Sequence, residues 1–164
     1  MLEAAISRVE WPIKVGSTQW ENPDRAVLPD EGLLFKTFLD SYRQAPPCRV
    51  MPSGSYFRAY HHALEQLLSA GDTVVHVAHS PEDREGVFGW AAGTRHRLYY
   101  VYTKEIYRGN DVATRLIMSV CDTGQALRHV FSTRGGLALL RKICARPPIL
   151  DLDQLGNILP ASCH

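Results

Sequence analysis

The stretch of residues 97–121 constrains the fold most, because two different structural patterns follow each other in it without a break. Residues 98–103 are aromatic and β-branched, a composition that predicts a β-strand. The later part predicts an amphipathic helix from the helical spacing of its apolar residues, which are Val112, Leu116, Ile117, Val120 and Cys121. A short polar turn with Arg108, Gly109 and Asn110 lies between them. Because a helix leaves its first N–H groups free, this junction predicts a phosphate-binding site.

The rest of the pattern predicts helices and strands of a single domain that covers residues 1–164. Two helices come first, one capped by Asp30 and one capped by Ser53, which ends near Gly71. Their expected inner faces are the apolar residues at helical spacing, which are Leu34, Phe35, Phe38, Leu39 and Tyr42 in the first helix and Tyr56, Tyr60, Ala63, Leu64, Leu67 and Leu68 in the second. Further strands are expected at residues 73–78, 87–93, 127–131 and 149–152, and a further helix at residues 135–145. We expect residues 1–29 to be irregular apart from a short edge strand at 13–15, and residues 153–164 to form a loose tail.

Composition limits the classes of protein. The chain has 45% hydrophobic and 21% charged residues, which is ordinary for a soluble globular protein, and no apolar run approaches the ~20 residues that span a bilayer. Its start contains an early acid, Glu3, and lacks the apolar core of a signal peptide, so we expect a cytoplasmic protein without membrane contact. The 4 cysteines show no short paired spacing, so we expect neither a metal site nor a disulfide framework.

A family resemblance appears in residues 107–116, which read Tyr-Arg-Gly-Asn-Asp-Val-Ala-Thr-Arg-Leu. This segment resembles the acyl-CoA pyrophosphate loop of the GNAT superfamily of N-acetyltransferases. That motif reads Arg or Gln, two residues, Gly, one residue, then Gly or Ala. Arg108, Val112 and Ala113 match it, while Asp111 stands where the family has its central Gly. The resemblance implies a GNAT-like α/β (α+β) fold over roughly residues 30–152, with a mixed, mostly antiparallel central sheet flanked by helices.

The resemblance also implies how acetyl-CoA binds. The strand before the loop would splay from its neighbour, so that the main chain of Val101 and Thr103 contacts the pantetheine arm. The loop would wrap the pyrophosphate mainly through N–H donors, in a set made of Arg108, Gly109, Asn110, Asp111, Val112, Ala113 and Thr114. Arg108 or Arg115 would add a charge-assisted contact. Asp111 opposes this use, because its carboxylate adds bulk and a repelling charge, whereas an acid suits the start of a helix that binds no anion.

The candidates for catalysis are less sharply defined. Residues 133–142 resemble a second family pattern, in which Leu140 replaces the Tyr that protonates the leaving thiolate. Ser132, Thr133 or a water would then supply the proton. As general base for an amine acceptor, Tyr102 and Glu105 lie nearest the expected cleft. The histidines at 76 and 79 are further candidates for acid–base work, although each such residue is more often structural.

Basic residues are concentrated in residues 95–146, where ten Lys and Arg stand against three acids, a net charge of +7 that the rest of the chain offsets with −6. Such a basic half fits the phosphates of coenzyme A or a nucleic acid backbone, and a solvated face without a ligand is the alternative. Nucleic acid is the less favoured partner, because Glu105 and Asp111 interrupt the window at its centre.

Three functions therefore stand open. The first is an acyl-CoA-dependent N-acyltransferase, in which an unidentified amine attacks the thioester directly. The second is a binding or assembly module of the same fold that has lost the reaction, as Asp111 and Leu140 suggest. The third is a nucleic-acid-modifying enzyme of GNAT type, motivated by the basic window. Fold alone does not decide among them.

Overall fold

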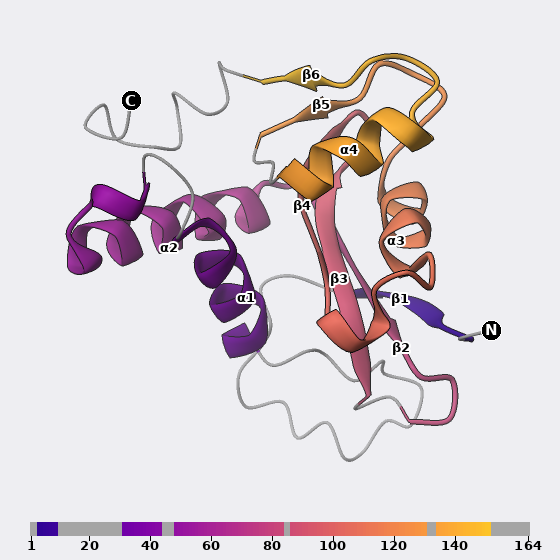
Figure 1. Ribbon diagram of the computed structural model, residues 1–164, viewed down its shortest axis with the longest axis horizontal. Coiled ribbons are helices and arrows are strands. Elements are labelled where there is room, and N and C mark those ends of the chain that lie inside the picture. Colours follow the sequence, from indigo (N-terminus) through magenta and orange to yellow (C-terminus); the bar gives the residue numbers. More distant parts are fainter. Residues whose placement is uncertain (1–2, 10–30, 44–47, 84–85, 131–133, 152–164) are drawn as a thin grey trace.

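The computed structural model describes residues 3–9, 31–43, 48–83, 86–130 and 134–151. In this part of the chain, 6 strands form one sheet in the order β1-β2-β3-β4-β5-β6 (Figure 1). The strands are β1 (Ala5–Val9), β2 (Val74–His79), β3 (Val87–Thr94), β4 (Arg97–Thr103), β5 (Arg128–His129) and β6 (Ile149–Leu150). Strands β1 to β4 pair antiparallel, whereas β4, β5 and β6 pair parallel. The prediction of an α/β fold with a mixed, mostly antiparallel sheet is confirmed.

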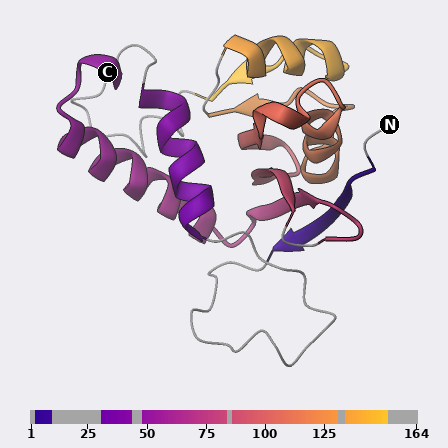
Figure 2. The same cartoon turned by 60° about the horizontal axis from the view of Figure 1, so that its bottom comes forward.

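The helices cover both faces of the sheet, as Figures 1 and 2 show from two directions. They are α1 (Glu31–Arg43), α2 (Ser53–Ser69), α3 (Val112–Val120) and α4 (Arg134–Ile143), with short 3-10 turns η2 (Cys48–Val50) and η3 (Glu105–Tyr107). The element order is two helices, a three-stranded meander, helix, strand, helix and strand, preceded by a first strand. This is the element order that the GNAT resemblance implies.

Each face of the sheet has its own core. Helices α1 and α2 pack an aromatic core against one face, which includes Phe38, Tyr56, Tyr60, Trp90 and Tyr100. Helices α3 and α4 pack a mainly aliphatic core against the other, which includes Ala91, Leu98, Leu116, Ile117 and Leu140. Trp90, Ala91 and Ala92 alternate between the two cores along β3, because successive side chains of a strand point to opposite faces. The apolar positions predicted for α1, α2 and α3 are all buried, so their helical periodicity identified the inner faces correctly.

Some predicted boundaries are corrected. Residues 5–9 were expected to be irregular, but they form β1, whose five residues all pair with β2 from Ala5–His79 to Val9–Val75. The sequence missed this strand because it is short and owes its order to a partner about seventy residues away. Ser53 does not cap α2; it is the first helical residue, and Pro52 holds the cap position. Asp30 and the strand expected at 13–15 lie outside the described residues.

The later elements are shorter than expected. Strand β5 has two residues, although residues 127–131 were expected, and β6 has two residues of the expected 149–152. No helix in the described ranges combines the length and the apolar character needed to cross a membrane. The short β5 matters for the site, because within the described residues it pairs with only the first two residues of β4.

Candidate functional site

A bulge in β4 separates the strand from β5. Gly93 of β3 pairs with Leu98, and Ala92 pairs with Tyr100, so Tyr99 is the extra residue on β4. A bulge bends its strand and increases the local twist. In the described residues, β4 pairs with β5 only at Arg97 and Leu98, and the Leu98 carbonyl accepts a last bond from the Val130 N–H at 3.2 Å. Among the described residues, the second half of β4 therefore has an open edge, with no strand paired on this side, as a strand that splays from its neighbour would.

The backbone of Val101 and Thr103 faces this open edge. The N–H of Lys104 donates to the Phe88 carbonyl on β3 at 2.8 Å, so Lys104 and, two residues earlier, Tyr102 direct their backbone groups toward β3. Because alternate residues of an antiparallel strand point their backbone groups to opposite sides, Val101 and Thr103 direct theirs away from β3. The side chain of Arg108 also approaches on the open side, where its Nε lies 3.4 Å from the Thr103 carbonyl oxygen. An extended ligand can add to the strand at this edge.

The turn after β4 has two left-handed residues. Gly109 has a φ of 83° and Asp111 a φ of 57°, and they are the positive-φ residues of the described chain. The Asn110 amide Nδ2 lies 3.4 Å from the carbonyl oxygens of both Tyr107 and Arg108, which holds the turn together. Position 111 is where the family motif has Gly, the residue that adopts positive φ without steric cost. Asp111 has a positive φ like the Gly of the motif, although it lacks the conformational freedom of Gly.

Helix α3 begins at this turn with unused N–H groups. Asp111 occupies the cap position, and its side chain makes no capping hydrogen bond. Its left-handed backbone explains this, because a capping residue normally needs an extended conformation to reach back to the helix. Among the hydrogen bonds of the described residues, none uses the N–H of Val112, Ala113 or Thr114 as a donor. These amides, with the positive end of the helix dipole, can bind an anion.

A cleft joins the open edge of β4 to the start of α3. Its larger part has a volume of about 480 Å³ and is lined by Ser41, Tyr100, Val101, Tyr102, Thr103, Arg108, Ala113, Gly135, Gly136 and Leu139. A smaller part of about 190 Å³ is lined by Thr103, Tyr107, Arg108, Gly109, Asp111, Val112, Ala113, Thr114 and Leu139. Four residues line both parts, so the two are continuous. Of the residues predicted to bind acetyl-CoA, all line one or both parts except Asn110, which instead braces the turn.

Thr103 provides a test of whether the cleft suits a polar ligand. Its Oγ1 is buried and has no hydrogen-bond partner among the residues that the structure describes. A buried hydroxyl without a partner costs about 1–3 kcal/mol, so such atoms are rare unless a ligand or water satisfies them. Thr103 lines both parts of the cleft, at the point where they meet. The residues present therefore fit a ligand that is extended along β4 and anionic at α3.

The predicted catalytic residues are distributed unevenly. Tyr102 lines the larger part of the cleft, whereas Glu105 is exposed at the start of η3 and lines neither part. Ser132 and Thr133 lie outside the described residues. Leu140 is 2% exposed and belongs to the core on the α3 side. Helix α4 thus presents Gly135, Gly136 and Leu139 to the cleft, and none of these side chains can donate a proton.

The two histidines considered as acid–base groups serve the sheet instead. His79 is buried, with its Nε2 2.9 Å from the hydroxyl of Ser7 on β1 and its Nδ1 2.7 Å from the Ser80 carbonyl. His76 has its Nδ1 2.8 Å from the Ser119 hydroxyl on α3, and burial, with a smaller effect of Arg8, lowers its pKa. Neither lines the cleft. Both bind elements together rather than facing a substrate.

Sequence reasoning missed two hydroxyl groups at the far end of the cleft. The Tyr100 hydroxyl donates to the Thr37 carbonyl at 2.9 Å and lies 2.5 Å from the Ser41 hydroxyl of α1. Burial raises the pKa of Tyr100 well above its usual range, so this phenol stays protonated at neutral pH. The aromatic content of β4 marked Tyr100 as core, which it is, but no pattern in the sequence brings Ser41 to the same place. Among the described residues, no cluster of three or more His, Cys, Asp or Glu could hold a metal ion.

Comparison with known proteins gives structural similarity only. No family model and no curated protein matches the chain. A ribosomal-protein-alanine N-acetyltransferase from Brucella melitensis biovar Abortus is similar at a TM-score of 0.48 and 14% identity, over 88% of this chain and 93% of that one. A predicted acetyltransferase from Clostridium acetobutylicum, solved with acetyl-CoA, scores 0.41 at 14% identity, over 85% and 88%. A GNAT-family acetyltransferase from Staphylococcus aureus scores 0.38 at 9% identity, over 84% and 67%.

Proposed function

We propose that this GNAT-like chain is an acyl-CoA-dependent N-acyltransferase that transfers an acetyl group to an amine. Scores and identities as low as those of the similar structures decide nothing about activity, so the proposal rests on the geometry of the cleft. Its main support is one continuous arrangement: β4 leaves β5, passes through two left-handed residues, and enters α3 with unused N–H groups. That arrangement suits a ligand with an extended arm and a pyrophosphate.

The acyl donor would bind mainly through backbone groups. Its pantetheine arm carries amides, which can pair with the backbone of Val101 and Thr103 as an additional strand would. Its pyrophosphate would accept from the N–H groups at the start of α3, with Arg108 as the nearest cation of the cleft. The orphaned Thr103 hydroxyl lies between these two contacts and would gain a partner.

The reaction would follow from positioning. The amine nitrogen attacks the thioester carbonyl carbon, the new C–N bond forms as the C–S bond breaks, and coenzyme A leaves as a thiolate. An open-edge N–H of β4 can polarise the carbonyl. The nitrogen loses one proton and the thiolate gains one. The proton from nitrogen would pass to water. Because the Leu140 side chain has no acidic proton, the proton for the thiolate would come from a hydroxyl of the cleft lining, such as that of Tyr102, or from water.

A second candidate is a module that binds the ligand without transferring the acyl group. Two observations favour it: the position resembling the usual proton donor is a buried leucine, and the Asp111 carboxylate stands at the anion-binding end of the cleft. The cleft alone does not separate these two functions. A protein that binds acetyl-CoA but never releases free coenzyme A in the presence of an amine would be the module.

The test is calorimetric titration of acetyl-CoA into the purified full chain, followed by a thiol-release assay with a panel of amines. We expect micromolar-range binding, a rise in the melting temperature with saturating ligand, and thiol release with at least one amine class. Absence of both binding heat and thermal shift would reject both candidate functions together. Binding without thiol release across peptide N-termini, polyamines and aminoglycosides would favour the module.

A further inference from the structure

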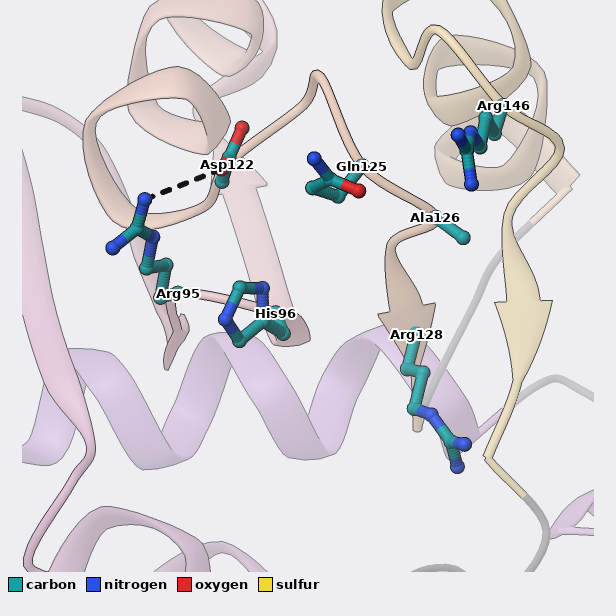
Figure 3. A pocket seen from close by; sticks show the side chains of 7 residues that line it. All are labelled: Arg95, His96, Asp122, Gln125, Ala126, Arg128 and Arg146. Atoms are coloured by element: carbon teal, nitrogen blue, oxygen red, sulfur yellow. Dashed lines mark ion pairs between the residues drawn. The ribbon is translucent and has the colours of Figure 1, made fainter.

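A second pocket lies at the other end of β4. It has a volume of about 360 Å³ and is formed by the turn between β3 and β4, the loop after α3, the start of β5 and the loop after α4 (Figure 3). Strand β4 runs from Arg97 to Thr103, so at about 3.3 Å per residue its two ends are roughly 20 Å apart. None of the residues of this pocket lines the acyl-CoA cleft. The pocket is therefore a separate site.

Positive charge converges on this pocket. Its lining includes Arg95, Arg128 and Arg146, together with His96 and Gln125, against the single carboxylate of Asp122 (Figure 3). The Arg95 Nη2 lies 3.6 Å from Asp122 Oδ2, and this ion pair is the dashed line in the figure. With the imidazole neutral, three guanidinium groups and one carboxylate leave two uncompensated positive charges. A concave surface lined by one sign of charge concentrates its field and attracts counter-ions.

Among the described residues, the one buried carboxylate near the remaining arginines, Asp151, is shared between Arg97 and Arg128. Asp151 is 2% exposed, and its Oδ2 lies 2.7 Å from Arg97 Nε but 3.8 Å from Arg128 Nη1. Asp151 thus contacts Arg128 but lies closer to Arg97, and the Arg128 side chain is 51% exposed. Arg146 is exposed and has no ion pair with any described carboxylate. Arg128 and Arg146 are accordingly the cations that an incoming anion would meet.

We propose that this pocket binds the phosphate group of a small phosphorylated molecule. Guanidinium groups present planar N–H donors that match phosphate oxygens in pairs, which a single ammonium cannot do. His96 and Gln125 add side-chain donors from two further segments. The volume lies within the range of small-ligand sites, about 300–1,000 Å³. Convergence of four segments on one hollow favours a compact anion over a nucleic acid, whose phosphates would need cations spread along a face.

This site does not depend on the proposed acyltransferase activity. The probes are inorganic phosphate, glycerol 3-phosphate and a fluorescein-labelled single-stranded oligonucleotide, each added to the full chain at constant ionic strength. Residue-resolved amide shifts in ¹H–¹⁵N NMR report where each phosphate probe binds. We expect saturable shifts at residues 95–96, 122–128 and 146, and glycerol 3-phosphate to bind at least as tightly as inorganic phosphate.

Three variants test the assignment. Arg146→Glu should weaken phosphate binding at the pocket by about tenfold or more, because it reverses the charge of a lining residue that forms no ion pair with a described carboxylate. Arg146→Lys should weaken it only a few-fold, since the charge remains but the planar donors are lost. Arg49→Glu is the matched control: Arg49 is equally exposed, lies on η2 outside the pocket, and should leave the pocket shifts unchanged.

Three kinds of result would overturn the proposal. Equal weakening by Arg146→Glu and Arg49→Glu, or shifts scattered over the whole basic surface, would mean non-specific attraction. Submicromolar, steeply salt-dependent oligonucleotide binding that Arg146→Glu abolishes would assign the pocket to a nucleic acid instead. Saturable shifts confined to the start of α3 would show that phosphate prefers the acyl-CoA cleft and that this pocket is empty of function.

Discussion

The two ends of β4 are suited to anions by different means. At the carboxyl end the donors are backbone N–H groups at the start of α3, fixed by two left-handed residues. At the amino end they are the side chains of Arg95, Arg128 and Arg146. Backbone donors need only a conformation, and many sequences can supply it. Side-chain donors need particular residues, and one substitution can remove them.

This difference explains how little of the family motif the chain keeps. Arg108 and Ala113 match, and the central Gly is replaced by Asp111, yet the backbone at 111 still has the positive φ that a Gly would adopt. The shape of the loop has persisted through a change of residue. Substitutions that change the conformation at one end of β4 and the charge at the other test whether the two ends bind anions independently.

The largest effect is expected from Gly89→Ala, which adds a methyl group to β3 beside Tyr102 and Thr103, two residues of the cleft. A Cβ on Gly89 would lie 2.2 Å from the Tyr102 carbonyl oxygen, closer than real contacts permit. Gly89→Ala should therefore lower the free energy of unfolding by about 3 kcal/mol and displace Tyr102 and Thr103. Urea denaturation measures the first effect, and loss of acetyl-CoA binding heat in calorimetry measures the second.

Gly93 and Gly54 provide the controls. A Cβ on Gly93 would lie 2.4 Å from the Arg97 carbonyl oxygen, so Gly93→Ala should destabilise the protein similarly but disturb the arginine end of β4. A Cβ on Gly54 of α2 would meet no atom within 4 Å, and Gly54→Ala should be neutral or slightly stabilising. If Gly89→Ala and Gly93→Ala weaken acetyl-CoA binding equally, the two ends are not independent.

The next effect comes from Asp111, where conformation and charge can be separated. Asp111→Gly should strengthen coenzyme A binding by on the order of 1–3 kcal/mol, because it removes a carboxylate from the anion site and suits the positive φ. Asp111→Ala removes the charge but keeps the strained φ, so it should bind coenzyme A better than the parent yet unfold more easily than Asp111→Gly. Calorimetry and urea denaturation of the three proteins give both quantities. Unchanged or weaker binding by Asp111→Gly would show that the loop holds no pyrophosphate in this register.

The sequence predicted the helices and strands better than it predicted the contacts between them. Periodicity gave the inner faces of α1, α2 and α3, and the β-branched and aromatic runs gave β2, β3 and β4. It also gave most of the residues that line the cleft, because Val101 to Thr114 are contiguous in the chain. It did not give Ser41 or the bulge at Tyr99, since both depend on which distant segment a residue faces. For the same reason, the sequence showed Arg95, Arg128 and Arg146 only as part of an excess of positive charge and did not place them in one pocket.

A smaller effect should separate the two cations that face anions at opposite ends. Arg108→Gln should weaken coenzyme A binding by about tenfold, because a charge-assisted contact at the cleft is lost while the backbone donors remain. Arg146→Gln removes the same charge at the other end and should change coenzyme A binding by less than about twofold at moderate salt. Calorimetry of both variants checks this. Equal weakening would indicate a diffuse electrostatic effect of the basic half.

Arg115 gives a further control within the same helix. Its Nη2 donates to the Ala4 carbonyl beside β1 at 2.7 Å, so it ties α3 to the edge of the sheet. Arg115 lines neither part of the cleft, although the sequence left open whether Arg108 or Arg115 makes the charge-assisted contact with the pyrophosphate. Arg115→Gln should therefore lower the melting temperature while leaving coenzyme A binding within about twofold. A larger loss of binding than in Arg108→Gln would reverse the assignment.

The smallest expected effect concerns His129, where the pairing between β4 and β5 ends. His129 pairs with Leu98, is 4% exposed, and has a buried Nδ1 without a hydrogen-bond partner in the described part of the chain. Burial lowers its pKa, so the unfolded chain takes up a proton at a higher pH than the folded protein does. Its contribution to the free energy of unfolding is therefore fully present above about pH 6.5 and is lost as the pH falls below that value. His76, whose pKa is also lowered, acts in the same direction.

Urea denaturation between pH 7.5 and pH 5 should thus show falling stability, and His129→Gln should flatten part of the slope even if it is less stable at pH 7.5. Phosphate and coenzyme A titrations at the same two pH values then sharpen the comparison, because protonation at this pairing should loosen the strand that lies between the two sites. A slope that His129→Gln leaves unchanged would assign the pH dependence to other groups.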